Sequence, residues 1–97
     1  MTPTQKDEGV TTQTNSEQQY LHLVRLAWDL RWAGSTVSVE LPCDGEPFVQ
    51  VARAVGPLRV RASVRGQHWV FTWGRGRNQW AYALDADAAR QIRAALR

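Results

Sequence analysis

The residue types that perform covalent or acid–base chemistry are scarce in this chain, and their spacing does not bring them together. The sequence contains two histidines, His22 and His68, and a single cysteine, Cys43. Nucleophilic catalysis needs a Ser, Thr or Cys beside a base that a third group holds in place. A zinc site needs three or four ligands at compatible spacing. Neither pattern is found at these positions, so we expect a protein that is not an enzyme and that uses no metal and no other cofactor.

Two pairs of acidic residues are close enough in the sequence to suggest acid–base work. Asp44 and Glu46 flank a glycine in a polar turn, and Asp85 and Asp87 stand where a C-terminal helix would begin. A carboxylate at a helix N-terminus accepts free backbone N–H groups and suits the helix dipole. We therefore interpret the first pair as turn residues and the second as capping residues.

Arginine side chains are the strongest candidates for a binding surface. Residues 1–50 carry three basic and seven acidic side chains, a net charge of −4, whereas residues 51–97 carry nine arginines and two aspartates, a net charge of +7. This asymmetry is compatible with an acidic partner or nucleic acid, although a GC-rich coding sequence also produces it. The candidate partner-binding residues are Arg59, Arg61, Arg65, Arg75, Arg77 and Trp80.

The segment Gly74-Arg75-Gly76-Arg77 is similar to half of a phosphate-binding loop. Such loops follow a strand and open a helix, whose N-terminus supplies N–H groups to the phosphate. Here the segment leads into another predicted strand. Two interpretations therefore stay open: a flexible hairpin loop, or an arginine-tipped loop that contacts phosphate or carboxylate groups.

Hydrophobic periodicity predicts the elements that position these side chains, beginning with a helix over residues 16–32. Ser16 and Gln19 have the spacing of a capping box, and Gly34 suits the C-terminal end of the helix. The predicted core side of this helix contains eight apolar residues: Leu21, Leu23, Val24, Leu26, Ala27, Trp28, Leu30 and Trp32.

Alternation of apolar and polar residues predicts about five strands in an antiparallel meander. The predicted strands cover residues 36–41, 49–55, 58–65, 68–73 and 79–84. Gly66-Gln67 suits a two-residue hairpin turn with glycine first. In that register Arg65 opposes His68, Val64 opposes Trp69, Ala62 opposes Phe71 and Val60 opposes Trp73, with Val70 pointing outward as the one apolar exception. A slip by one residue would expose all these apolar side chains, so the register is strongly specified.

A last helix follows, with Ala89, Ile92 and Leu96 on its apolar side and Arg90 on its cationic side. The sequence therefore predicts an α+β fold, in which an N-terminal helix, a meander of about five antiparallel strands and a C-terminal helix follow one another. Both helices should pack on the apolar face of the sheet. The other face should be open, and it should carry Arg59, Arg61, Arg65 and His68.

The five tryptophans, Trp28, Trp32, Trp69, Trp73 and Trp80, all fall on predicted core faces. Core packing is therefore the first interpretation of these residues. Together with Tyr20, Phe71 and Tyr82 they are nevertheless a large volume for a core of this size, so one or more of them near an edge should stay partly exposed. Exposed tryptophan beside arginine is typical of protein–protein interfaces.

Residues 1–15 are rich in Thr, Gln, Asp and Glu and nearly free of large apolar side chains. We expect a disordered tail there and a single domain over residues 16–97. The N-terminus has one lysine and no apolar run typical of a secretory signal, and no segment has the length of an apolar membrane helix. A single cysteine also fits a reducing compartment, so we expect a cytoplasmic protein that does not contact membranes.

Roughly the last 30 residues contain three characteristic segments: His68-Trp69-Val70-Phe71-Thr72-Trp73-Gly74-Arg75, Arg77-Asn78-Gln79-Trp80 and Asp85-Ala86-Asp87-Ala88-Ala89-Arg90. In these segments the chain resembles a group of small actinobacterial proteins of unknown function. Those proteins have an aromatic strand that ends in Trp-Gly or Trp-Thr-Gly, then a strand and a closing helix rich in Asp, Ala and Arg. Their genes often lie beside helix-turn-helix regulators. The resemblance implies a regulatory accessory role and supplies no catalytic residues.

Three functional hypotheses follow. The first is a non-enzymatic protein that binds another protein, such as a regulator, or itself as a dimer, because edge strands and Trp/Arg surfaces favour such contacts. The second is nucleic-acid binding by the arginines of the outer sheet face and the Gly-Arg loop, although that face is expected to lack the aromatic side chains on which bases stack. The third is a small ligand between the helices and the Trp-rich sheet.

Overall fold

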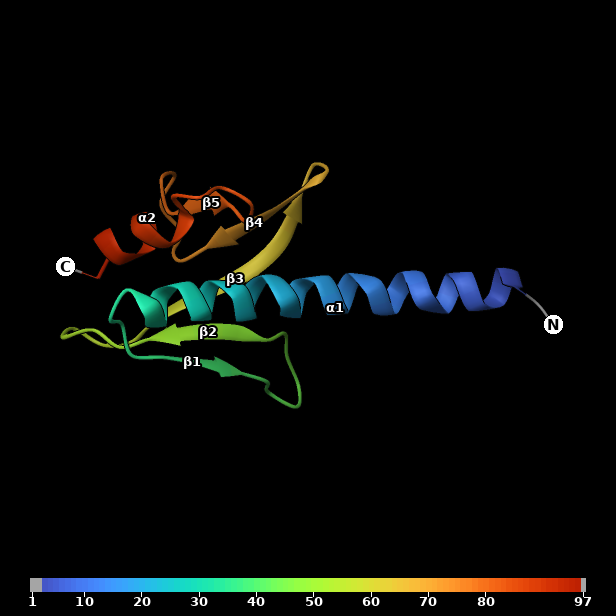
Figure 1. Ribbon diagram of the computed structural model, residues 1–97, viewed down its shortest axis with the longest axis horizontal. Helices are drawn as coiled ribbons and strands as arrows, with labels where there is room; N and C mark the ends of the chain where they lie inside the picture. The colour runs from blue at the N-terminus through green and yellow to red at the C-terminus, as the bar shows by residue number, and fades with distance from the viewer. Residues whose placement is uncertain (1–2, 97) are drawn as a thin grey trace.

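The computed structural model describes the backbone of residues 3–96 and the side chains of residues 16–96. Its elements are α1 (Pro3–Trp32), β1 (Val37–Glu40), β2 (Phe48–Val51), β3 (Leu58–Arg65), β4 (His68–Thr72), β5 (Trp80–Tyr82) and α2 (Ala88–Ala94). The five strands form one antiparallel sheet in the order β1-β2-β3-β4-β5. Both helices pack on one side of this sheet (Figure 1). The predicted α+β fold is thereby confirmed.

The helix α1 does not begin where the sequence suggests. It runs through Ser16, so the predicted capping box of Ser16 and Gln19 is wrong. Gln19 instead joins α1 to the sheet, because its Nε2 donates to Oε1 of Glu46 at 2.6 Å and to the carbonyl of Ala62 at 2.9 Å. The predicted disorder of residues 1–15 falls on a segment whose side chains lie outside the described residues, and it stays a prediction.

The eight apolar residues predicted for the core side of α1 form two stripes in the structure, and the stripe that contains Trp28 and Trp32 stays outside the core. The buried residues of α1 are Leu23, Leu26, Ala27 and Leu30, which have the i, i+3, i+4, i+7 spacing of one helix face. Trp28 and Trp32 lie on another side, with 60% and 75% of their surface exposed. Their predicted place in the core is wrong, because eight apolar candidates spread around the helix and a sheet covers only one stripe of them.

The sheet twists strongly and curves around α1. The first part of β3 pairs with β2, from Val51↔Leu58 to Val49↔Val60, and the last part pairs with β4. Because these two neighbours use different halves of β3, β1 and β2 lie on one side of α1 and β4 and β5 lie on the other (Figure 1). Such right-handed twist is the ordinary consequence of backbone sterics in strands.

The predicted hairpin between β3 and β4 is confirmed. Gly66 has a φ of +65°, whereas Gln67 has no positive φ, as in a two-residue turn with glycine first. The ladder contains the predicted pairs Val64↔Trp69, Ala62↔Phe71 and Arg65↔His68. It ends at Arg61↔Thr72, so the predicted pair of Val60 and Trp73 is not part of it, although both side chains are buried.

The side chains of β5 point to the faces of the sheet opposite to the predicted ones. Ala81 lies opposite Phe71 and is buried in the core, so Trp80 and Tyr82 point to the other face of the sheet. The prediction of Trp80 as a core residue is therefore wrong. Val70 does point outward as predicted, yet it is fully buried, with Tyr82 as its neighbour on β5.

Every predicted strand except β3 is shorter in the structure, and the start of the last helix differs from the predicted one. The strand β2 ends at Val51, so Val55 lies outside it and is exposed. The helix α2 begins at Ala88, and it is Asp87 that occupies the N-cap position, without a side-chain capping bond. Asp85 therefore does not cap the helix, and its Oδ1 instead accepts the backbone N–H of Asp87 at 2.8 Å. Ala88 and Ile92 are the buried residues of α2.

Candidate functional site

The face of the sheet opposite the helices, which we name the outer face, is open. The strand register places on it Ser38, Glu40, Phe48, Gln50, Arg59, Arg61, Ser63, Arg65, His68, Val70, Thr72, Trp80 and Tyr82. Within the described strands, Glu40 is the only acidic residue on this face, against three arginines. The outer face is therefore cationic along its central strand.

Each of these arginines lies beside an aromatic ring. The Cζ atoms of Arg59 and Arg61 are 4.9 Å and 5.4 Å from the centre of the Phe48 ring, and that of Arg65 is 5.0 Å from the Trp80 ring. Cation–π contacts of this kind contribute roughly 0.5–1 kcal/mol at exposed sites. They hold each guanidinium group at the sheet surface without neutralising its charge. None of the three has a salt bridge to a described carboxylate.

A group of aromatic side chains covers the β4–β5 end of the outer face. The rings of Trp80 and Tyr82 meet edge to face with centroids 5.1 Å apart, and those of Tyr82 and His68 are 5.5 Å apart. Tyr82 is 48% exposed. The place of Phe48 and Tyr82 on this surface was not predicted from the sequence, although the small Ala81 between two large aromatic residues is a signal that this strand turns its rings outward.

A groove lies where β4 separates from the first half of β3, and we name it the arginine groove. It has a volume of about 410 Å³, and its polar lining includes Arg53, Arg59, Arg61, Thr72 and Arg75. No acidic side chain among the described residues lines it. The structure thus brings three of the predicted partner-binding arginines together there. Arg77 is exposed in the same loop as Arg75 but does not line the groove.

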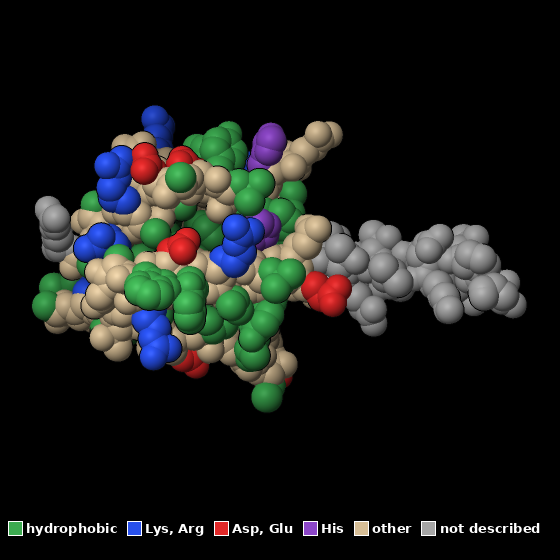
Figure 2. Space-filling view, viewed as in Figure 1, with side chains coloured by type: hydrophobic (Ala, Val, Ile, Leu, Met, Phe, Trp, Pro, Cys, Tyr) green, Lys and Arg blue, Asp and Glu red, His purple; other side chains and the backbone are tan. Residues whose placement is uncertain are grey.

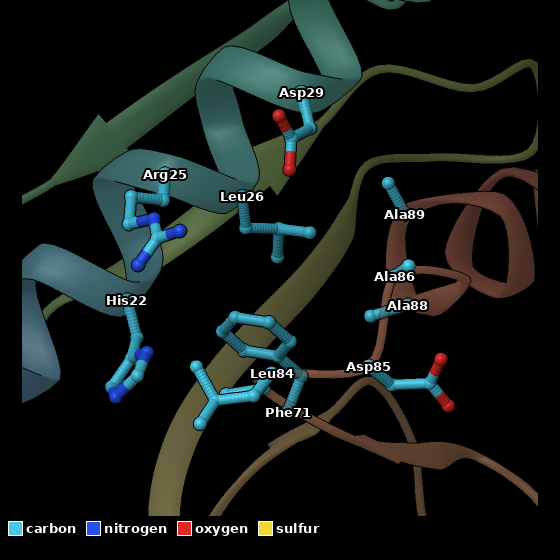
Figure 3. Close-up of a pocket in the computed structure, with 11 residues that line it drawn as sticks. His22, Arg25, Leu26, Asp29, Phe71, Leu84, Asp85, Ala86, Ala88 and Ala89 are labelled. Carbon is cyan, nitrogen blue, oxygen red and sulfur yellow. The ribbon is translucent and has the colours of Figure 1, made fainter.

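A second cavity, of about 270 Å³, lies between α1 and the segment that joins β5 to α2. His22, Arg25 and Asp29 come from α1, and Leu26 and Phe71 lie at its floor (Figure 3). No hydrogen bond joins His22 to a carboxylate or to a nucleophile within the described part of the chain. The predicted small-ligand site between the helices and the sheet would lie here, and its ligand stays a prediction.

His22 should make the stability of the fold depend on pH. Burial, and to a lesser degree the charge of Arg25, lower its pKa below the ordinary value of 6.5. At pH values under 6.5 the unfolded chain therefore binds a proton that the folded chain resists. The free energy of unfolding should fall as the pH decreases below that value, and His22→Asn should remove the contribution of His22 to this pH dependence. Urea melts at several pH values measure the free energy of unfolding of both proteins. The same pH dependence in the variant and the parent would contradict the prediction.

The exposed tryptophans of α1 form a separate apolar surface. The rings of Trp28 and Trp32 meet at 73° with centroids 6.1 Å apart, and they line a shallow hollow with Arg31. Figure 2 shows hydrophobic side chains gathered over the C-terminal half of α1 on this side of the molecule. Large exposed apolar groups next to arginine are typical of residues that contribute most of the energy of protein interfaces.

Among residues 16–96, no group of three or more His, Cys, Asp or Glu side chains is placed to hold a metal ion. Of the helices in the described chain, none has the length and apolar character needed to cross a membrane. Comparison of the chain with known protein families, with curated proteins and with solved structures finds no significant match.

Proposed function

We propose that this protein binds single-stranded nucleic acid on the outer face of its sheet. The observation that carries the proposal is the pairing of arginines with aromatic rings on an open sheet surface, above all Arg65 beside Trp80 at 5.0 Å. Proteins that bind single strands combine a cationic track for phosphates with aromatic side chains on which bases stack. The outer face has both.

The reversed orientation of β5 is what favours this function over the others. An outer face without aromatic side chains would disfavour nucleic-acid binding, because bases would have nothing to stack on. Phe48, Trp80 and Tyr82 all lie on that face, so this argument no longer holds. A single strand fits better than a duplex, because stacking on protein aromatics requires unpaired bases.

Removing the central arginines should abolish most of the binding. We expect a mixed-sequence single-stranded oligonucleotide to bind in low salt with an affinity that decreases as salt increases. In the triple variant Arg59→Ala/Arg61→Ala/Arg65→Ala, the magnitude of the slope of log K against log salt should decrease by about 2. Each phosphate contact contributes about 0.7 to this magnitude for single strands. Fluorescence anisotropy across a salt series gives both quantities.

The matched control removes three arginines from the helices. Arg31, Arg90 and Arg93 are exposed and none lies on the outer face; Arg90 forms a surface ion pair with Asp87 at 2.8 Å. Their replacement by alanine changes the net charge equally and should leave the slope within about 0.5 of the parent value. An equal loss of oligonucleotide affinity in the two triple variants would overturn the proposed function. A parent protein that does not bind the oligonucleotide at low salt would also overturn it.

A second candidate is self-association through α1, in the regulatory accessory role that the sequence resemblance implies. The exposed pair of Trp28 and Trp32 favours it, together with the alternation of Arg25, Asp29 and Arg31 along the same helix. A second copy packed antiparallel would bring opposite charges together around the two rings.

Changing the tryptophans to serine tests this candidate. We expect light scattering to show a dimer whose population increases with concentration, and Trp28→Ser/Trp32→Ser should be monomeric over the same range. Neither side chain is part of the core, so the variant should keep the parent's stability within about 1 kcal/mol. A parent protein that is monomeric at every concentration would contradict self-association.

A further inference from the structure

The arginine groove has a chemistry that differs from that of the stacking surface beside it. It opens where the ladder between β3 and β4 ends at Arg61↔Thr72, next to the first half of β3. We propose that this groove is a phosphate subsite, which holds a backbone phosphodiester of a strand whose base stacks on Trp80. This inference rests on the proposed function and assigns a separate role to the groove.

Fixed hydrogen-bond donors line one wall of the groove. Arg53 is half-buried, and its Nε donates to the carbonyl of Gly56 at 2.8 Å while Nη1 donates to that of Ala95 at 3.3 Å. These two bonds use neutral acceptors, so they orient the guanidinium group and leave its charge uncompensated. Three of its five N–H donors have no partner among those bonds. An oriented arginine is well suited to bind phosphate oxygens in a bidentate manner.

The opposite wall is the loop of residues 74–79, which the Gln79 side chain holds closed. Oε1 of Gln79 accepts the backbone N–H of Gly76 at 2.8 Å, and the backbone N–H of Gln79 bonds to the carbonyl of Gly76. A Cβ atom on Gly74 would lie only 1.9 Å from Oε1 of Gln79. A side chain at position 74 would therefore displace the Gln79 amide from this position. These bonds order the loop backbone next to Arg75, whose exposed side chain lines the groove. An ordered loop lowers the entropy that binding must overcome.

The groove also lies at the right place relative to the stacking surface. Thr72 lines the groove and is the direct partner of Trp80 across β4 and β5. Directly paired residues on one face have Cβ atoms about 4.5–5.5 Å apart. A base on the Trp80 ring therefore has its phosphate within reach of the groove. Arg59 and Arg61 belong to both the groove and the outer face and connect the two.

Arg75→Ala and Arg77→Ala form a matched pair of variants for the test. Both side chains are exposed in one loop and both changes remove one charge, but only Arg75 lines the groove. We expect Arg75→Ala to weaken oligonucleotide binding about tenfold and to reduce the salt slope by about 0.7. Arg77→Ala should change affinity less than about twofold. Equal effects of the two variants would overturn the phosphate subsite and leave the proposed function intact.

Gln79 acts through the loop and is a positioning residue. Gln79→Ala should weaken binding several-fold with the salt slope unchanged, because the charge of Arg75 is kept while its position is not. The amide of Gly76 should exchange faster with solvent in this variant. A reduced slope, or an unchanged affinity, would contradict the positioning role.

An oligonucleotide of abasic sites distinguishes phosphate binding in the arginine groove from base stacking on Trp80, because it keeps the phosphates and lacks the bases. Its binding should be weakened by Arg75→Ala and should be insensitive to Trp80→Ala. If no oligonucleotide binds, the proposed function fails, and tripolyphosphate added to ¹⁵N-labelled protein then tests the groove alone. Shifts at the amides of the groove residues, including Arg53, Thr72 and Arg75, would support the subsite. The absence of such shifts would overturn it.

Discussion

Replacing Phe71 by alanine is expected to lower the free energy of unfolding by about 3–5 kcal/mol, the range found for buried aromatic side chains. Phe71 is 2% exposed, lies between Ala62 of β3 and Ala81 of β5, and faces the core. Because a domain of this size has a total stability of only several kcal/mol, the variant should be largely unfolded. Denaturant melts followed by circular dichroism measure the difference.

The neighbouring Thr72 is the control for this prediction, since its side chain points to the outer face. Thr72→Ala should lower the free energy of unfolding by less than about 1 kcal/mol. The two changes are one residue apart in β4, so they share its backbone environment and differ mainly in the face to which they point. Equal losses, or a larger loss in the Thr72 variant, would mean that the assigned faces of β4 are reversed.

Trp73 and Trp80 should respond to alanine substitution in opposite ways. Trp73 is 6% exposed and belongs to the core, so Trp73→Ala should destabilise the protein by about 3–5 kcal/mol. Trp80 lies on the outer face beside Arg65, and Trp80→Ala should cost less than about 1.5 kcal/mol of stability. It should instead weaken oligonucleotide binding about tenfold or more, since stacking on one aromatic side chain contributes roughly 1–3 kcal/mol per base.

Both properties are measured on each variant, by denaturant melts and by fluorescence anisotropy with a single-stranded oligonucleotide. A stable Trp80→Ala protein with parental affinity would remove the main support for stacking on the outer face. A Trp80 variant as unstable as the Trp73 variant would show that β5 turns this ring into the core.

Local patterns were sufficient for the central hairpin. Eight residues of β3 alternate without a fault, the turn has glycine at the position that requires a positive φ, and the facing strand alternates in the matching phase. Since the side-chain period of a strand is 2, these constraints admit a single register. The arginines of β3 were therefore assigned to the open face from the sequence alone.

The same patterns failed where an element has apolar residues on more than one side. In α1 the two stripes are both hydrophobic, and helical periodicity does not say which one the sheet covers. The choice of Leu23, Leu26, Ala27 and Leu30 depends on how β1, β2 and β3 approach the helix. In β5 the large aromatics suggested the core face, but Ala81 occupies it, since Phe71 on the adjacent strand already fills that space.

The sequence by itself determined the order of the elements, the antiparallel meander, the β3–β4 register and the cationic outer strand, because each depends on contacts between near neighbours in the chain. Only the tertiary structure decided the orientation of β5, the exposure of Trp28 and Trp32, and the meeting of Arg53 with Arg75 in one groove. Those features depend on the twist of the sheet around α1, which brings together residues that are distant in sequence.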